Sequence, residues 1–375
     1  MKSQKQEQTM NIIVQSYLIL VPFLVYNIGA NVPTTENGAT ANYLNIWHTT
    51  KVPGFEKNVE LDKAKKYFNN GQFQKAIDLL ERLVAITTLP REAYLEASEL
   101  LAVAHVSINQ EKEAEEIFSQ ILHKYPDYKI GEQWWPHKRL MTLFYKISKK
   151  EQGSLKVSSK GPGIQTIAIM DFENNSIDDA EKYGNLGNAL AKIIISDFAV
   201  LSKLRVVERE RIQFIIDELE LTAKKVGGKN IMDPEYAPRV GKLLGAHSFV
   251  FGSFMRIGKT FRMDVRLVKT ETGEIFKTAS VEGKPDKILD LAKQLTVKIT
   301  KDLKVKIEDV EKEKIEKLGK EDIPIEALAL FGDAMSKANQ EEYRDASVDL
   351  EAAIAMAPNF QKAHDMLTVI RPLTL

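Results

Sequence analysis

The sequence predicts the fold class α/β (α+β). A central mixed sheet with packed helices ends in a C-terminal antiparallel meander, and helical hairpins flank this unit on both sides. Residues 164–300 alternate short apolar runs with amphipathic segments, as the strands and helices of one sheet-containing domain do. Residues 59–150 and 325–375 instead carry small and apolar residues at helical spacing. A chain of 375 residues with 44% hydrophobic residues has room for two or three domains with real cores.

The N-terminus, residues 1–30, has the pattern of a secretory signal peptide. Lys2 and Lys5 precede an apolar run from Ile12 to Val25, and the small pair Gly29–Ala30 follows. We therefore expect export, with cleavage after this pair. An uncleaved membrane anchor is the first alternative, because the run is near the lower length that spans about 30 Å of hydrocarbon. A cytosolic location is the second.

Residues 31–58 are polar, contain Gly and Pro and lack periodicity, so we expect a spacer. Residues 59–150 then form a helical domain. Asn69-Asn70-Gly71 divides its first part into two helices, a second helical pair runs from Glu96 to Pro126, and one apolar helix follows at Lys138–Lys146. Small residues recur where two antiparallel helices would touch, with large apolar residues beside them. The matching positions are Ala64, Tyr67, Gly71, Phe73, Ala76 and Leu80, then Ala102, Ala114, Phe118, Ile121 and Pro126.

The same pattern recurs a third time in residues 325–375. All three copies resemble tetratricopeptide-type hairpins, and the resemblance implies docking of a protein partner on a concave helical surface. Two repeats followed by one fall below the three that a self-supporting solenoid needs. Helices that mainly support the central unit are therefore an equal alternative. The matching positions of the third copy are Ala334, Tyr343, Ala346, Leu350, Ala353 and Pro358.

Two segments connect these parts of the chain. Residues 151–163 are rich in Lys, Ser and Gly and have no pattern, so we expect a flexible linker. Residues 301–324 are dense in charge, with apolar residues every three or four positions. We interpret them as a solvated helix.

The central unit, residues 164–300, can be assigned element by element. The apolar run Thr166–Phe172 predicts a buried strand, and Leu186–Ala199 predicts a helix that is apolar nearly all round. Residues 204–220 run from strand into helix, and residues 233–246 form a further helical segment. Three strands follow and end in the sequence SVEG.

The three last strands have the clearest pattern. In TFRMDVRLV, apolar and charged residues alternate, which predicts one buried and one wet face. Gly258-Lys259 opens one tight hairpin and Glu271-Thr272-Gly273 closes the next. The apolar set is Phe261, Met263, Val265 and Leu267, and the charged set is Arg262, Asp264 and Arg266.

Three segments of this unit resemble the CsgG-like family of bacterial envelope proteins, named for the curli secretion channel. VVERERIQFIIDEL is similar to the family's strand, Glu-Arg pair and amphipathic helix. GKLLGAHSFVFGSF is similar to its Leu-Gly-Ala segment entering a strand, and VRLVKTETGEIFKTASVEG to its last hairpin. The resemblance covers about a third of the chain. It implies a protein of the periplasm or outer membrane, active in envelope assembly or secretion, and a homo-oligomer formed through this domain.

Two departures separate this chain from the channel-forming members of the family. Those members carry long insertions that become transmembrane hairpins, whereas the corresponding connections here are tight turns. They are also lipoproteins anchored through an N-terminal Cys, where this chain has Asn31. A secretion-channel component is therefore the first alternative. A periplasmic domain that binds a small molecule or nucleotide through the loops at 174–187 and 224–233 is the second.

Composition excludes several classes of function. Lys plus Arg and Asp plus Glu balance at 52 each, so no net charge attracts nucleic acid. The chain has no cysteine, which excludes disulfides, thiolate metal ligands and Cys nucleophiles. Its 6 histidines include no pair three or four residues apart. We expect contact with a membrane through the N-terminal segment at most.

The sequence also lacks the motifs of catalytic and cofactor-binding sites. Residues 184–187 and 227–229 lack the glycine spacing of phosphate loops. The run Glu208–Arg211 predicts a strand-to-helix cap with an ion-pair cluster. We therefore predict no enzyme and no catalytic, cofactor-binding or metal-binding residue. Four acidic residues after the first strand lack the alternating spacing of a Ca²⁺ loop, and these are Asp171, Glu173, Asp178 and Asp179.

The predicted function is therefore interaction rather than catalysis. We expect a non-enzymatic, exported envelope protein that docks a protein partner with the first helices of its repeats. The predicted docking residues are Lys65, Phe68 and Asn69 in the first copy and Glu99, Val103 and Val106 in the second.

Overall fold

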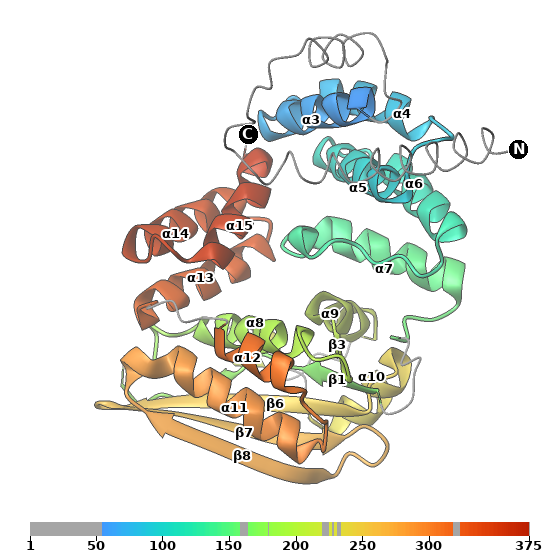
Figure 1. Ribbon diagram of the computed structural model, residues 1–375. Coiled ribbons are helices and arrows are strands. Elements are labelled where there is room, and N and C mark those ends of the chain that lie inside the picture. Colours follow the sequence, from blue (N-terminus) through green and yellow to red (C-terminus); the bar gives the residue numbers. More distant parts are fainter. Residues whose placement is uncertain are drawn as a thin grey trace, which may run out of the picture. The chain divides into compact units, whose positions relative to one another are not determined.

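The computed structural model describes most of the chain after its N-terminal segment (Figure 1). From Lys57 to the C-terminus the chain forms one compact unit. The predicted signal segment and nearly all of the predicted spacer lie outside the described residues. The described ranges are 55–157, 164–178, 180–219, 225–226, 229–230, 234–317 and 323–374.

A mixed sheet forms the centre of this unit, as predicted. Its strands run in the order β3-β1-β6-β7-β8, and β2 pairs with β6 beside β1. The β1/β3, β1/β6 and β2/β6 pairs are parallel, and the β6–β7–β8 meander is antiparallel. The bounds are β1 Gln165–Ile169, β2 Glu173–Asn174, β3 Leu204–Val207, β6 Ser248–Ile257, β7 Thr260–Lys269 and β8 Ile275–Gly283. A separate hairpin pairs β4 Lys225–Val226 with β5 Lys229–Asn230.

The meander follows the predicted alternation. On β7, Phe261 and Met263 are buried, whereas Arg262 and Arg266 are exposed. Two residues join β6 to β7, and the first of them, Gly258, has a φ of +55°. This conformation suits glycine, which has no Cβ to clash, so the tight turn and the alternation are both confirmed.

The first strand is shorter than predicted. It ends at Ile169, although the N–H of Met170 still donates to the carbonyl of Val250 at 3.0 Å. The next residue, Asp171, forms an ion pair with Arg209, which begins the second helix after this strand.

Two apolar cores cover the two faces of the sheet. One joins Ala168 and Phe249 to helices α9 and α10 and continues into the N-terminal helices. The other joins Ile167 and Val250 to helices α8 and α11 and continues into the C-terminal helices. The bounds are α8 Leu186–Ala199, as predicted, α9 Arg209–Glu218, a 3₁₀ turn at Pro234–Tyr236, α10 Ala237–Leu244, a second turn at Pro285–Lys287 and α11 Ile288–Asp302.

Within the described residues five helices precede the sheet, and we call them the N-terminal block. Small residues lie fully buried where these helices touch, as the repeat pattern predicts: Ala64, Ala76, Ala102 and Ala114. The last helix, α7, packs on α9, with the rings of Tyr145 and Phe214 5.9 Å apart. The bounds are α3 Phe55–Asn69, α4 Phe73–Val84, α5 Arg91–Ser107, α6 Glu111–Lys124, a 3₁₀ turn η1 Glu132–Trp134 and α7 Lys138–Gln152.

The last three helices of the described residues, α13 to α15, form what we call the C-terminal hairpin. The predicted pair is α13 (Ile325–Ala338) and α14 (Tyr343–Met356); α15 (Gln361–Ile370) and a 3₁₀ turn (Arg371–Thr374) extend it. Helix α13 packs on α8 so closely that a Cβ added to Gly332 would lie 2.2 Å from the carbonyl oxygen of Asn185.

The connecting segments are partly packed. Leu155 and Val157 are buried, and the N–H of Val157 donates to the carbonyl of Leu244 at 2.8 Å. This portion of the predicted flexible linker therefore lies against α10, whereas residues 158–163 are outside the described range. In the charged segment, α12 (Asp309–Lys317) buries Ile315. None of the helices in the described ranges is both long and apolar enough to cross a membrane.

Candidate docking cavity

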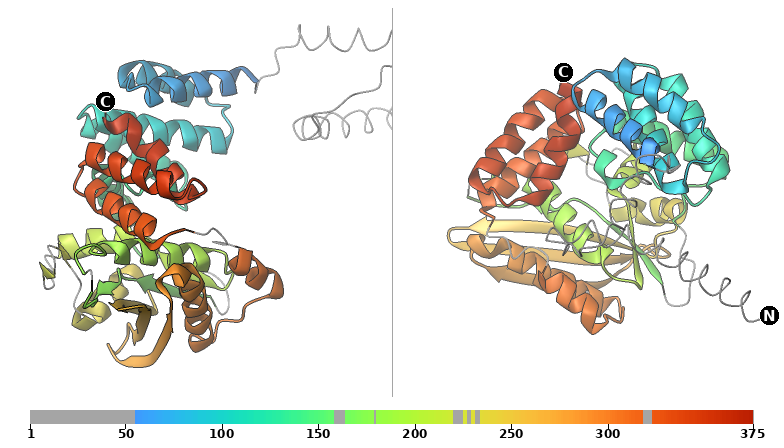
Figure 2. Two further views of the ribbon diagram at one scale, coloured as in Figure 1. Left: turned by 90° about the vertical axis from the view of Figure 1, so that its left-hand side faces the viewer. Right: turned by 45° about the horizontal axis from the view of Figure 1, so that its top comes forward.

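The N-terminal block and the C-terminal hairpin lie side by side over α8 and α9 (Figure 2). Between them is a cavity of about 590 Å³, which we call the central cavity. Its walls come from α3, α5 and η1 of the N-terminal block, from α13 and α15 of the C-terminal hairpin, and from α8 and α9 of the central unit. Residues more than 250 positions apart in the chain, such as Lys65 and Lys362, therefore share one surface.

The exposed surface of the wall is mostly apolar, and several large side chains contribute to it. Phe68 and Trp134 meet edge to face, with ring centroids 5.9 Å apart. Both are nearly buried, at 2% and 7% exposure, and so is the neighbouring Trp135 at 7%. From the opposite side, Phe331 and Met335 on α13 and Met366 and Val369 on α15 complete the wall.

Glu99 holds the aromatic wall in place. Its carboxylate accepts hydrogen bonds from the Tyr128 hydroxyl at 2.7 Å, the Trp134 indole N–H at 3.0 Å and the Gln133 amide at 3.2 Å. The backbone N–H of Gly131 donates a fourth at 3.3 Å. Burial raises the pKa of Glu99 above its ordinary value, and the bonds from Tyr128 and Trp134 oppose that rise. The carboxylate thus fixes the η1 segment that carries the two tryptophans.

Three lysines line the cavity, and each contacts a neighbouring side chain. The ammonium of Lys65 lies 2.6 Å from Glu96. The ammonium of Lys192 lies 4.0 Å from the centroid of the Trp135 ring, a cation–π contact. Lys362 donates to the Ser196 hydroxyl at 3.0 Å.

Two polar atoms in the wall are buried without a hydrogen-bond partner among the described residues. They are the indole N–H of Trp135 and one carboxylate oxygen, Oε2, of Glu210. Burial raises the pKa of Glu210, while the positive charges of Lys192 and Arg209 oppose the rise. A donor and an acceptor are therefore unpaired in the same wall.

The start of α9, beside Glu210, is an ion-pair cluster, as the sequence predicts. The Arg209 guanidinium donates from Nε to Asp171 at 2.6 Å, and Arg211 lies 3.1 Å from Glu208. Lys129, from the N-terminal block, adds a longer contact of 3.9 Å to Glu208. These charges neutralise one another and tie the N-terminal block to the central unit.

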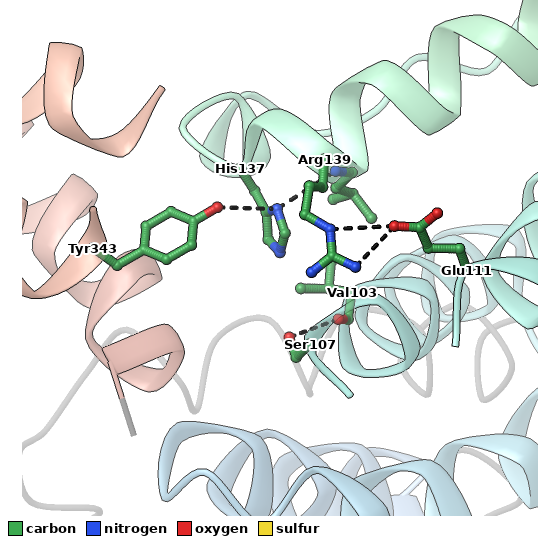
Figure 3. A network of polar contacts seen from close by, with 7 residues as sticks. Val103, Ser107, Glu111, His137, Arg139 and Tyr343 are labelled. Atoms are coloured by element: carbon green, nitrogen blue, oxygen red, sulfur yellow. Dashed lines mark hydrogen bonds and ion pairs between the residues drawn. The ribbon is translucent and has the colours of Figure 1, made fainter. Parts of the chain in front are cut away.

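A polar contact between His137 and Tyr343 joins the N-terminal block to the C-terminal hairpin (Figure 3). The unprotonated Nδ1 of His137 accepts from the backbone N–H of Leu140 at 3.4 Å and is 3.4 Å from the Tyr343 hydroxyl. Burial lowers the pKa of His137 to about 4, and the positive charge of Arg139 contributes. Arg139 itself donates to Glu111 at 2.8 Å. Protonation of His137 would turn the shared acceptor into a donor.

The structure brings four of the six predicted docking residues together. Lys65, Phe68, Asn69 and Glu99 all line the central cavity. Val103 and Val106 do not, because α5 packs against both α4 and α6 and leaves these two side chains 0% exposed. They belong to the core of the N-terminal block and do not project toward a groove, which corrects the prediction for these two positions.

Sequence reasoning missed the opposite wall of the cavity. Lys362, Asp365, Met366 and Val369 line it from α15. Their spacing of three, four and seven residues marks one face of a helix, so the pattern was present in the sequence. The spacing does not show which segment this face of α15 packs against. No comparable pattern in the sequence identifies Lys192 and Glu210, from the central unit, as cavity residues.

The loops considered for a small ligand use their polar groups internally. The Asn174 side chain donates to the carbonyl of Ala180 at 2.8 Å, and the Asp178 carboxylate accepts from the N–H of Gly258 at 2.6 Å. Most of the loop at 224–233 lies outside the described range, as does Asp179. Among the residues that the structure describes, no group of His, Asp and Glu side chains is arranged to hold a metal ion.

Comparison with known proteins leaves the family open. No protein-family model and no curated protein matches the chain. Similar solved structures include the LpoB C-terminal domain from Salmonella enterica, with 14% identity over 41% of this chain and 99% of that one and a TM-score of 0.26. The same domain from Escherichia coli has 15% identity, coverage of 40% and 98%, and a TM-score of 0.25. Lipoprotein GNA1162 from Neisseria meningitidis has 13% identity over 38% of this chain and 99% of that one, and a TM-score of 0.25. At these scores the likenesses carry no argument about this chain.

Proposed function

We propose that this chain is a non-enzymatic, exported cell-envelope protein that docks a protein partner in its central cavity. The observation that carries the proposal is the convergence of both helical blocks on one concave, mostly apolar surface of about 590 Å³. Such a surface, with a few convergent polar groups, is typical of binding sites. Four residues that the repeat pattern selects for docking, Lys65, Phe68, Asn69 and Glu99, belong to it.

Two of the four carboxylates in the cavity are not placed for catalysis. Glu99 is saturated by four donors, and Glu96 is paired with Lys65. A general acid or base needs a free position beside its substrate, which neither of these carboxylates offers. The signal-peptide pattern of residues 1–30 and the CsgG-like order of motifs support export and a place in envelope assembly or secretion.

The first experiment separates an adaptor from a channel component. Residues 31–375 would be produced without the predicted signal segment, and their mass in solution measured by light scattering with and without detergent. We expect a monomer or small oligomer that needs no detergent. A large ring that can be extracted only with detergent would instead establish the channel alternative.

The second experiment tests docking directly. A photo-crosslinking amino acid would be placed at Asn69 or Asp365, two exposed positions on opposite walls, in the full chain in its native host. We expect both positions to trap the same protein, identified by mass spectrometry. The matched control is Arg262, which is exposed on strand β7 and does not line the cavity. Equal trapping at Arg262, or none at either wall, would refute docking in the cavity.

A further inference from the structure

We propose that the outer edge of β8 is a second interaction surface, which takes an extended acidic segment of a protein partner as an added strand. β8 ends the strand order of the sheet, and among the described residues no strand pairs with its outer side. Figure 1 shows β8 at the border of the sheet, with α11 over one face. The residues of β8 are not among those that line the central cavity, so this inference goes beyond the proposed function and does not depend on it.

The hairpins of the meander fix which backbone groups of β8 face outward. Thr260 faces β6, because it closes the two-residue turn between β6 and β7. Alternate residues of a strand face alternate neighbours, so the odd-numbered residues of β7 face β8, as Lys269 does when its N–H donates to the carbonyl of Glu274 at 2.9 Å. Asp264 therefore faces β6, and Ser280, its partner in β8, faces away from β7. The residues whose N–H and C=O groups face outward are Thr278, Ser280 and Glu282.

One of these outward groups already binds a donor from outside the sheet. The ammonium of Lys298, on α11, donates to the carbonyl of Ser280 at 2.7 Å. This contact agrees with the outward direction of the carbonyl and shows that a donor can reach it from beyond the edge. A backbone N–H of an added strand would take the place of the ammonium, which would then be released for a carboxylate on that strand.

The centre of this edge is basic on both faces of the sheet. Lys277 and Lys298 lie on the face that α11 covers, Arg266 lies on the other face, and all three side chains are exposed. The side chains of Lys277 and Arg266 have no ion-pair or hydrogen-bond partner among the described residues. The acidic residues of the edge lie at its two ends. They are Glu274, in the turn, and Glu282, which is 3.9 Å from an arginine of β7.

These charges select the occupant of the edge. Exposed lysines on an edge strand oppose the pairing of two like edges. Two copies of β8 side by side would gather Lys277 and Lys298 of both copies on one face, which disfavours a second copy of this chain. A strand with Asp or Glu opposite Lys277 turns the same charge into an attraction, as opposite charges in a cross-strand pair do. In strand addition of this kind, backbone hydrogen bonds supply affinity and alternate side chains supply selectivity.

Peptides with methylated backbone N–H groups test the addition of a strand. The probe is a fluorescein-labelled peptide of about nine residues, the length of β8, that alternates threonine with glutamate. In antiparallel pairing, a glutamate opposite Lys277 has its N–H directed away from β8, and the threonines direct theirs toward it. We expect the fluorescence anisotropy to rise to saturation with the full chain. Methylation of the threonine N–H groups should abolish this binding, and methylation of the glutamate N–H groups should leave it unchanged.

Variants of the edge test its charge and its backbone separately. Lys277→Gln should weaken the glutamate peptide by about fivefold and leave a glutamine peptide unchanged. Ser280→Pro removes only an outward N–H, which an edge strand tolerates, so it should weaken both peptides by at least roughly tenfold. Urea denaturation checks that this variant keeps its fold. Lys112→Gln, exposed on α6, is the matched control and should change nothing.

Amide hydrogen exchange reports on the edge in the full chain. The N–H groups of Thr278 and Ser280 should exchange fast in the free protein and slowly when the glutamate peptide is bound. The N–H of Val281, which faces β7, should be protected in both states. Exchange at Ser280 as slow as at Val281 in the free protein would show that the edge is already covered, and would overturn the inference.

Other results would also overturn it. Equal affinity for glutamate, glutamine and lysine peptides would refute an acidic occupant, and absence of binding or binding that survives threonine methylation would refute strand addition. A dimer that Ser280→Pro converts to a monomer would show that the edge pairs with a second copy. None of these results bears on the cavity, which crosslinking at Asn69 and Asp365 tests. Because Arg262 is one strand in from this edge, a protein trapped there counts against docking in the cavity only if the cavity walls trap the same protein.

Discussion

Glu99 shows how one residue can be selected correctly for a site and still have a different role. Its position in the second repeat predicts a contact with a partner. In the structure its carboxylate faces inward and accepts from Tyr128, Trp134 and Gln133. Glu99 therefore positions the tryptophan wall, and a partner would contact that wall.

Replacing Glu99 should destabilise the protein and disturb the cavity together. In Glu99→Ala the buried hydroxyl of Tyr128 and indole N–H of Trp134 lose their acceptor, so we expect the free energy of unfolding to fall by about 3 kcal/mol. Urea denaturation measures this fall, and the emission of Trp134 should shift as its ring is released.

The matched control lies one turn away on the same helix. Glu96 is half exposed and pairs with Lys65, so Glu96→Ala should lower the free energy of unfolding by less than about 1 kcal/mol. Equal losses in the two variants would mean that the hydrogen bonds to Glu99 do not hold the wall.

His137 should make stability depend on pH. Burial lowers its pKa to about 4 from an ordinary 6.5, so the unfolded chain binds more protons than the folded one between these values. The contribution of His137 is complete above pH 6.5 and is lost as the pH falls toward 4. Between pH 7.5 and 4.5 we expect a loss of about 2 to 3 kcal/mol from this residue, by linkage.

Urea denaturation of His137→Asn at these two pH values tests the expectation. Asparagine also accepts at a helix N-terminus but does not titrate, so the variant should lose less stability on acidification than the wild type does. Tyr343→Phe removes the hydroxyl near His137 and keeps the imidazole, and should therefore keep the pH dependence. Identical pH profiles for His137→Asn and the wild type would rule out His137 as a source.

At the scale of elements, a prediction agrees with the structure where the interactions that form the element lie within its own segment. Helix α8 spans the predicted Leu186–Ala199 because the apolar residues that define it are close together in the sequence. The strand β1 ends earlier than predicted, and Asp171 beyond its end pairs with Arg209, which lies 38 residues ahead and which no local pattern indicates. Leu155 and Val157 are packed despite a linker-like composition, because α10 offers them an apolar surface.

The contact between α13 and α8 gives an element-scale prediction. Alanine normally stabilises a helix over glycine by about 1 kcal/mol. Gly332→Ala should instead destabilise the protein by about 2 kcal/mol, because the new Cβ would lie 2.2 Å from the carbonyl oxygen of Asn185 and force the helices apart. Denaturation in urea measures the sign. Ser336→Ala, one turn along α13, is the control and should be neutral or slightly stabilising. A stabilising Gly332→Ala would refute the close contact.

At the scale of the whole molecule, the flanking helices and the sheet share their cores. The N-terminal block continues the apolar core on one face of the sheet, and the C-terminal hairpin continues the core on the other. The helices thus support the central unit, as one of the two sequence interpretations holds, and they also form the walls of the cavity. Docking of a partner, the other interpretation, stays a prediction.

Shared cores predict a single cooperative unfolding transition. Calorimetry of residues 31–375 should show one transition, because neither block can open without exposing the core it shares with the sheet. A chain that ends at residue 322 should lose this transition, since α8 would expose the face that packs on α13. Two separate transitions, or a truncated chain that unfolds as sharply as the whole, would show that the blocks are independent domains.

The sequence by itself determined the fold class, the order of most strands and helices, the alternation on β7 and the small residues at helix contacts. It did not predict β2, the β4–β5 hairpin or α15. The predicted features follow from spacing within a segment, because each backbone period places apolar side chains on one face. Only the tertiary structure decided that α15 faces α3, that Val103 and Val106 are core residues, and that Lys192 and Glu210 join the cavity. Periodicity shows which face of a helix is buried. Which segment covers that face is decided by packing between segments that lie hundreds of residues apart in the chain.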